Sequence, residues 1–198
     1  MKRRTLLAGI GAVAALGATA PYRALALEAS AAESHVQSAV REVLDIVQGS
    51  GDAKAKAAKL KSVMESRAAM PQIARFAAGQ AWRDMSDAQQ GSYSNAFSHF
   101  LSTVYARRFQ GYAGETISVQ GVVDESRKGS LVRSTVTQPS GAPIVVEWLV
   151  TDRPGRVVIA DIVIEGVSLL LTQRDEVAGM LRAHGGDVDK LIADLNSA

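Results

Sequence analysis

The first half of the chain alternates apolar and polar side chains with the period of a helix. Between residues 87 and 109, the apolar and aromatic side chains recur at intervals of three and four: Tyr93, Phe97, Phe100, Leu101, Val104 and Tyr105. This spacing places them on one face of a helix. Ser86 and Gln89 form an S-x-x-Q capping box, which marks a helix start. The same period predicts further helices at 28–48, 53–66 and 71–79.

After Gly111 the apolar positions recur with a period of two, which is typical of β-strands. Strands are predicted at 115–124, 130–138, 143–152 and 156–165. The segments that join them, ESRKG, QPSGAP and DRPGR, are short and rich in turn-forming residues. Short turns between consecutive strands indicate an antiparallel meander. The last two strands are apolar on nearly both faces, so we expect both of those faces to be covered.

The stretch DIVIEGVSLLLTQRDE, residues 161–176, contains the sharpest change of period. Gly166 allows the backbone to turn after the last strand. Thr172 and Asp175 match a T-x-x-D capping box, which predicts a helix at 172–183, followed by another at 187–196. Residues 167–171 then form a connection with four large aliphatic side chains, although loops are normally polar. Such a connection either plugs the core or borders an apolar cavity.

Together these elements predict an α+β fold. It has a helical N-terminal half, a four-stranded and mostly antiparallel twisted sheet, and two C-terminal helices. The excess of aliphatic side chains around the sheet indicates a scaffold that can enclose an apolar ligand in a pocket.

The first 26 residues have the composition of an export signal. A basic start precedes an apolar run at residues 6–16, and the ALA at residues 24–26 fits the small-x-small cleavage rule. The RRTLL at residues 3–7 also matches a twin-arginine signal, with an ordinary Sec signal as the alternative. The apolar run is shorter than the roughly 20 residues of a membrane span. We therefore expect residues 27–198 to form a single exported domain.

Removal of that segment changes the charge balance. The segment holds four of the 22 basic residues and none of the 20 acidic ones, so 18 basic and 20 acidic residues remain. A nucleic-acid partner, for which a basic balance is typical, is therefore not expected. The chain has no cysteine, which excludes thiolate nucleophiles, thiolate metal sites and disulfides. A domain of this length can build a core without disulfides.

Catalytic motifs are scarce. The sequence contains no G-x-S-x-G, H-E-x-x-H or P-loop pattern. Ser168, Asp161 and Glu165 come nearest to a catalytic group, but backbone support by the serine and salt bridges from the acids to surface arginines are commoner roles. For His99, beside the apolar stripe, we expect a hydrogen-bonded structural role. The lysine run Lys54–Lys61 indicates a solvated helix face, with a docking surface as the alternative. We expect no enzyme activity, metal or cofactor.

Two segments carry a family pattern. In the stretch 161–195, the pattern is an acidic residue on the last strand, E-G-V-S, a Thr/Arg helix start, an L-R-x-x-G helix end and a final L-x-x-x-L helix. These elements fall on Asp161, Glu165, Gly166, Val167, Ser168, Thr172, Arg174, Leu181, Arg182, Gly185, Leu191 and Leu195. In the stretch 79–112, the residues in family order are Trp82, Ser86, Phe97, Phe100, Leu101, Tyr105 and Tyr112. With these patterns the chain resembles the MlaC, or toluene-tolerance (Ttg2-type), family of periplasmic phospholipid-binding proteins. The segment AAMPQIARFAAG departs from the family's usual aspartate–phenylalanine helix start.

The resemblance implies a pocket that holds glycerophospholipid tails and leaves the headgroup outside. It also implies a monomeric periplasmic shuttle between an outer-membrane Mla-type lipoprotein complex and an inner-membrane Mla-type ABC transporter, which maintains outer-membrane lipid asymmetry. Bound phospholipid is then the ligand. The alternatives are a small periplasmic hydrolase and a protein-docking module on the same scaffold. The candidate lipid contacts are Phe97, Leu101, Tyr105, Val146, Trp148, Ile162, Ile164, Val167 and Leu169.

Overall fold

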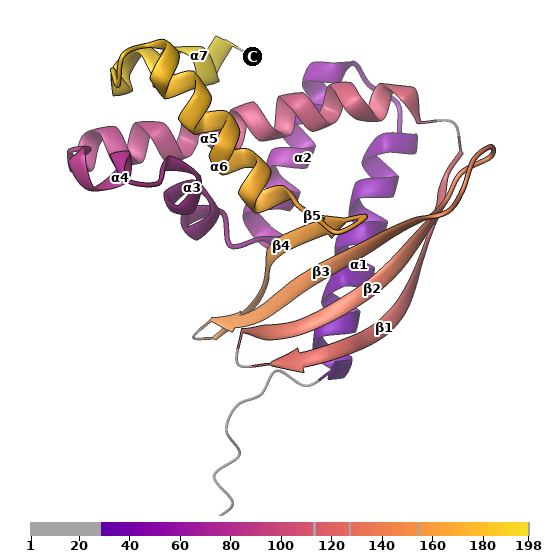
Figure 1. The fold of residues 1–198 in the computed structure, drawn as a ribbon. Coiled ribbons are helices and arrows are strands. Elements are labelled where there is room, and N and C mark those ends of the chain that lie inside the picture. The colour runs from indigo at the N-terminus through magenta and orange to yellow at the C-terminus, as the bar shows by residue number, and fades with distance from the viewer. Residues whose placement is uncertain (1–28, 113, 127, 154, 198) are drawn as a thin grey trace, which may run out of the picture.

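The computed structural model describes residues 29–112, 114–126, 128–153 and 155–197 (Figure 1). The predicted export signal therefore lies outside the described residues. The N-terminal half is helical, with α1 (Ala29–Gln48), α2 (Ala53–Arg67), α3 (Met70–Ala78), α4 (Ala81–Asp84), α5 (Asp87–Arg108) and the 3-10 turn η1 (Phe109–Gly111). The four predicted helices are confirmed to within one residue at each end. The four-residue helix α4 was not predicted, because one turn is too short to show a period.

The strands form one antiparallel sheet in chain order: β1 (Thr116–Ser126), β2 (Gly129–Thr137), β3 (Ile144–Arg153), β4 (Arg156–Ile164) and β5 (Val167–Ser168). All four predicted strands are confirmed to within two residues. The sheet has five strands and not four, because Val167 and Ser168 turn back and pair with β4. Two C-terminal helices follow, α6 (Leu169–Ala183) and α7 (Val188–Ser197), so the predicted α+β fold is confirmed.

One hydrophobic cluster lies among the helices around α5, and a second lies between α1 and the sheet. Figure 1 shows α1 lying across one face of the curved sheet, while α3, α4, α6 and α7 gather around the N-terminal half of α5. The helical cluster buries Tyr93, Phe97 and Val177, and the sheet cluster buries Val36 and Val132. Full burial of one large apolar side chain contributes about 1.5–3 kcal/mol. Each of these two regions therefore has its own core, and stability does not require side chains to fill all the space between them.

The start of α6 differs from the prediction. The helix begins at Leu169 and not at Thr172, because Ser168 is its N-cap and accepts a hydrogen bond from the Leu171 amide at 3.1 Å. Asp161 of the neighbouring strand accepts a second one from the Leu170 amide at 3.0 Å. These acceptors satisfy the free amides of the first turn three residues earlier than a cap at Thr172 would. The Thr172 hydroxyl instead donates to the Ser168 carbonyl at 2.9 Å.

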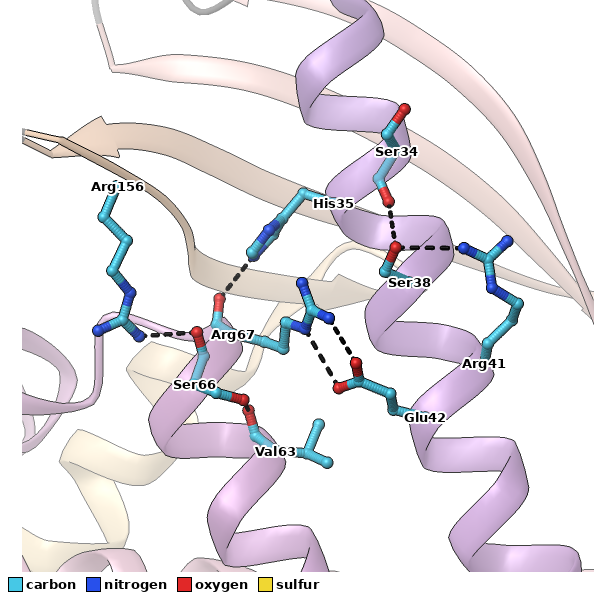
Figure 2. Close-up of polar contacts among 9 residues, drawn as sticks. All are labelled: Ser34, His35, Ser38, Arg41, Glu42, Val63, Ser66, Arg67 and Arg156. Carbon is cyan, nitrogen blue, oxygen red and sulfur yellow. Dashed lines mark hydrogen bonds and ion pairs between the residues drawn. The ribbon is translucent and has the colours of Figure 1, made fainter.

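The C-terminal end of α2 is fastened to α1 and β4 by polar contacts (Figure 2). The Arg67 guanidinium forms a two-pronged ion pair with Glu42 of α1, and this hydrogen bonding lowers the pKa of the Glu42 carboxyl. The Arg67 carbonyl lies 2.8 Å from Nε2 of His35. Arg156 of β4 donates to the Ser66 carbonyl at 2.7 Å. These bonds satisfy carbonyls that a helix end leaves without partners, and they fix Arg67 beside the space between α1 and the sheet.

Candidate functional site

A cavity of about 490 Å³ lies between α1, α2, the start of α3, α5, the start of α6 and the sheet. Its volume falls within the range of about 300–1,000 Å³ that is typical of ligand pockets. Its wall is almost entirely aliphatic and aromatic. The large apolar side chains in this wall are Val40, Val43, Leu44, Val47, Leu60, Val63, Met64, Met70, Ile73, Leu101, Tyr105, Phe109, Ile117, Val136, Ile144, Val146, Trp148, Ile159, Ile162, Ile164, Leu169 and Leu170.

The apolar stripe of α1 explains how the cavity arises. At the N-terminal half of the helix, Val36 packs directly against the sheet, next to Val132 and Val150. Farther along, Val43 and Leu44 line the cavity and are only half-buried. The helix therefore touches the sheet at one end, while the same stripe faces open space at the other. Protein interiors are normally close-packed. An unfilled apolar cavity between α1 and the sheet therefore indicates a binding site for an apolar ligand.

The sheet contributes side chains from β1, β2, β3 and β4 to the wall. Trp148 of β3 is the cross-strand partner of Ile162, and Val146 is the partner of Ile164. Residues spaced by two point to the same face of a sheet, so these four side chains form one continuous apolar surface. The indole N–H of Trp148 donates to the Ser134 hydroxyl at 2.8 Å, which satisfies the one polar group of that side chain.

Polar side chains line the cavity where α5 leads into β1. Arg108, Tyr112, Glu115 and Gln138 all belong to this end. The Arg108 guanidinium stacks over the Tyr105 ring at 5.3 Å from the ring centroid. Burial raises the pKa of the Tyr105 phenol, so the phenol is neutral at neutral pH. The cavity therefore has an apolar interior and a polar end that holds the charged residues Arg108 and Glu115.

Two further polar side chains border the cavity at the start of α6. The Asp161 carboxylate accepts hydrogen bonds from the Ile162 and Leu170 amides and from the Ser168 hydroxyl. Gln173 is 6% exposed, and its amide oxygen finds no hydrogen-bond partner among the described residues. Asp161 thus serves the backbone, whereas Gln173 is a buried amide at an otherwise apolar wall.

The structure places most of the predicted lipid contacts in this wall. Seven line the cavity: Leu101, Tyr105, Val146, Trp148, Ile162, Ile164 and Leu169. Phe97 lies instead in the helical core, stacked on Tyr93 with 5.8 Å between ring centroids. Val167 is 59% exposed and lies outside the lining. The predicted contacts missed the part of the wall that α1 and α2 form. The sequence does hold a signal for α1, because the predicted helix 28–48 carries an apolar stripe of Val36, Val40, Val43, Leu44 and Val47.

The candidate catalytic residues do not form a reactive group. Ser168 and Asp161 share a hydrogen bond of 2.6 Å, but within the described ranges no histidine is bonded to either. Glu165 accepts from the Val145 amide at 2.5 Å. The expected salt bridges from these acids to arginines are therefore wrong, because backbone and hydroxyl donors satisfy both carboxylates. The expected role of His99 is also wrong, since the side chain is exposed and makes no hydrogen bond to another described residue.

Other kinds of site can be assessed over the same described residues. No group of three or more His, Asp or Glu side chains there is arranged to hold a metal ion. Among the helices of this part of the chain, none is both long enough and apolar enough to cross a membrane.

The fold is similar to that of a phospholipid-binding protein from Ralstonia solanacearum, whose structure was solved in complex with a phospholipid. The TM-score is 0.68 at 24% sequence identity, and the match covers 84% of this chain and 95% of the other. At this identity the likeness establishes a shared fold. In addition, the sequence model of the MlaC protein family matches residues 37–197, which is most of the chain. The chain therefore belongs to the MlaC family.

Proposed function

We propose that this protein is a periplasmic phospholipid carrier whose cavity encloses acyl chains. The observation that carries the proposal is the apolar cavity of about 490 Å³ between α1 and the sheet. Membership of the MlaC family and the bound phospholipid of the Ralstonia relative support it. In this proposal residues 1–26 are a removed export signal, and residues 27–198 form a single phospholipid-binding domain.

The energetics of an acyl chain explain why a carrier needs such a cavity. Each CH₂ removed from water contributes about 0.8 kcal/mol, so a chain of about 16 carbons contributes roughly 13 kcal/mol. Transfer from a bilayer into an apolar pocket is nearly neutral by comparison, because both surroundings are apolar. A carrier of this kind lowers the barrier to crossing water but sets no direction. Partners must therefore impose the direction of transport.

We assign the tails to the apolar wall and the headgroup to its polar end. The proposed tail contacts are Leu101, Tyr105, Val146, Trp148, Ile162, Ile164 and Leu169. The headgroup lies beside Arg108, whose guanidinium provides donors for a phosphate. The hydroxyl of the neighbouring Tyr112 donates to the Glu115 carbonyl at 2.6 Å. This orientation keeps charged atoms out of the apolar interior, where an unpaired charge is costly.

The finer role follows from the family. We propose that the protein shuttles glycerophospholipid, as a monomer, between an outer-membrane Mla-type lipoprotein complex and an inner-membrane Mla-type ABC transporter, and so maintains outer-membrane lipid asymmetry. Bound phospholipid is the ligand, and the protein has no catalytic role. The hydrogen-bonded state of Ser168 and Asp161 gives no support to the hydrolase alternative.

The test combines lipid analysis of the wild-type protein with a variant whose cavity is partly filled by a larger side chain. Protein purified from a bacterial periplasm is extracted and analysed by mass spectrometry, and delipidated protein is incubated with phospholipid vesicles. We expect co-purified phospholipid and uptake from the vesicles. Leu44→Trp, which adds bulk at the half-buried wall, is expected to reduce uptake strongly. Val123→Trp on β1, where the side chain is 44% exposed and outside the lining, is the matched control. Wild-type protein that takes up no lipid would overturn the proposal.

A further inference from the structure

A second hollow, of about 360 Å³, lies where α3, α4 and α6 meet. Three arginines line it, one from each helix: Arg75, Arg83 and Arg174. We call these three residues and the hollow between them the arginine groove. Its lining contains no Asp or Glu. The groove is therefore a concave surface of concentrated positive charge on a chain whose expected mature form is slightly acidic.

We propose that the arginine groove is a docking site for an acidic segment of a partner protein. The inference rests on the proposed function only because a carrier has to dock before it delivers its lipid. The groove is separate from the lipid cavity and shares no lining residue with it.

The guanidinium groups of the groove are available to a ligand. All three arginine side chains are exposed, and none forms an ion pair or donates a side-chain hydrogen bond to another described residue. Arg174 stacks over the Phe76 ring, with its Cζ 4.9 Å from the ring centroid. This contact holds the guanidinium at the wall, and its N–H groups donate to no other described residue. Guanidinium edges match carboxylates through two parallel hydrogen bonds.

The other wall residues favour a peptide as the occupant. Trp82 and Phe76 add aromatic surface, and Gln72 and Gln80 add amides that can bond to a peptide backbone. Arginine and tryptophan are enriched among the residues that dominate binding energy at protein interfaces. The large apolar side chains that are exposed in the described parts of the chain, Val123, Val145, Val167 and Leu171, all lie outside the groove. A surface made for insertion into a membrane would instead place such side chains beside its cations.

The groove and the cavity share two helices. On α6, Gln173 faces the cavity and the next residue, Arg174, faces the groove. On α3, Ile73 faces the cavity and its neighbour Gln72 faces the groove. Since α3 packs against α6, a partner in the groove would contact the outer side of the same helices that wall the lipid. This placement suits a docking site for a partner that receives or supplies the lipid.

The experiment uses a fluorescein-labelled oligoglutamate peptide as the probe, with an oligoglutamine peptide of equal length as its control. Binding to the mature protein, residues 27–198, is followed by fluorescence anisotropy at low and high salt. The groove variant is Arg75→Glu/Arg83→Glu/Arg174→Glu. The matched control, Lys54→Glu/Lys59→Glu/Lys128→Glu, makes the same change in net charge at exposed lysines outside the groove. Circular dichroism checks folding, and the single variants Arg75→Glu and Arg83→Glu serve if the triple groove variant misfolds.

We expect the wild-type protein and the lysine variant to bind oligoglutamate, and the groove variant to lose affinity about tenfold or more. Oligoglutamine is expected not to bind. Equal losses in both triple variants would overturn the proposal, because binding would then follow net charge. Binding of inorganic phosphate or anionic vesicles at these arginines in place of oligoglutamate would also overturn it. Phospholipid content is measured in every variant, so that a failure of the lipid-carrier proposal is recognised separately from a failure of the docking site.

Discussion

Asp161 and Ser168 are joined by a hydrogen bond of 2.6 Å between the serine hydroxyl and the aspartate carboxylate, across the turn from β4 to β5. The turn itself places Glu165 and Gly166 at positive φ, of 49° and 80°. The same carboxylate and the same hydroxyl each accept an amide of the first turn of α6. The pair therefore couples the end of the sheet to the helix that closes the cavity.

The first prediction concerns this cap. Ser168→Ala is expected to lower the free energy of unfolding by about 1 kcal/mol, as loss of an N-cap typically does. Thr172→Ala is the matched control, and a loss below about 0.5 kcal/mol is expected because Thr172 does not cap the helix. Urea unfolding followed by circular dichroism measures both. Lipid content is expected to stay unchanged in the two variants. A larger loss for Thr172→Ala would contradict the observed helix start.

The second prediction concerns pH. The hydrogen-bonded ion pair with Arg67 lowers the pKa of Glu42 in the folded state. A carboxyl whose pKa is depressed by folding contributes stability above its unfolded pKa, which is about 4.3 for Glu. That contribution is lost as the pH falls from about 5 through the folded pKa. Glu42→Gln is therefore expected to lower the urea midpoint at pH 7 and to flatten its decline in acid.

Glu65→Gln is the control for the fall of the urea midpoint at acid pH. Glu65 forms an i,i+4 pair with Lys61 at 3.7 Å, which is too long for a hydrogen bond, and both side chains are partly exposed. Such surface pairs contribute little to stability. If Glu65→Gln weakens the fall of the urea midpoint in acid as much as Glu42→Gln does, the effect does not come from the Glu42–Arg67 pair.

The sequence predicts those parts of the fold in which local pattern and tertiary packing agree. The stripe from Tyr93 to Tyr105 predicts α5, and its capping box forms in the structure with both hydrogen bonds. The predicted start of α6 was wrong because Ser168 and Thr172 are both residue types that cap helices. The choice between them depends on Asp161, which lies on another strand, seven residues before Ser168. Only the turn at Gly166 brings that carboxylate to the helix.

The candidate site was predictable to a similar extent. Apolar alternation on β3 and β4 indicates side chains such as Trp148 and Ile162, which the sheet brings together. Phe97 has the same local pattern as Leu101 and both are buried in the helical cluster, but only Leu101 also lines the cavity. The local pattern does not distinguish the two positions. No pattern in the sequence predicts the arginine groove, because Arg75, Arg83 and Arg174 come from three helices that meet only in the folded chain.

The third prediction concerns Gln173. A buried carbonyl oxygen without a donor costs about 1–3 kcal/mol, so removal of the amide at constant shape is expected to stabilise the protein. Gln173→Leu in delipidated protein is expected to raise the free energy of unfolding by about 1 kcal/mol or more. Gln120→Leu, at an exposed position of β1, is the control, with an expected change within about 0.5 kcal/mol. Destabilisation by Gln173→Leu would indicate that the amide is bonded in solution.

The fourth prediction uses the two tryptophans of the chain as position-specific reporters. Trp148 lines the cavity, whereas Trp82 lies in the helical part, edge-on to Tyr93 with 6.2 Å between ring centroids. Bromine atoms on acyl chains quench only an indole that they touch. Delipidated Trp82→Phe, which keeps Trp148, is therefore expected to lose fluorescence when it is loaded with a phospholipid that carries brominated tails. Trp148→Phe, which keeps Trp82, is expected to stay bright under the same loading. Quenching of Trp82 with Trp148 unaffected would place the tails outside the cavity between α1 and the sheet, and the wall assigned to the lipid would be wrong.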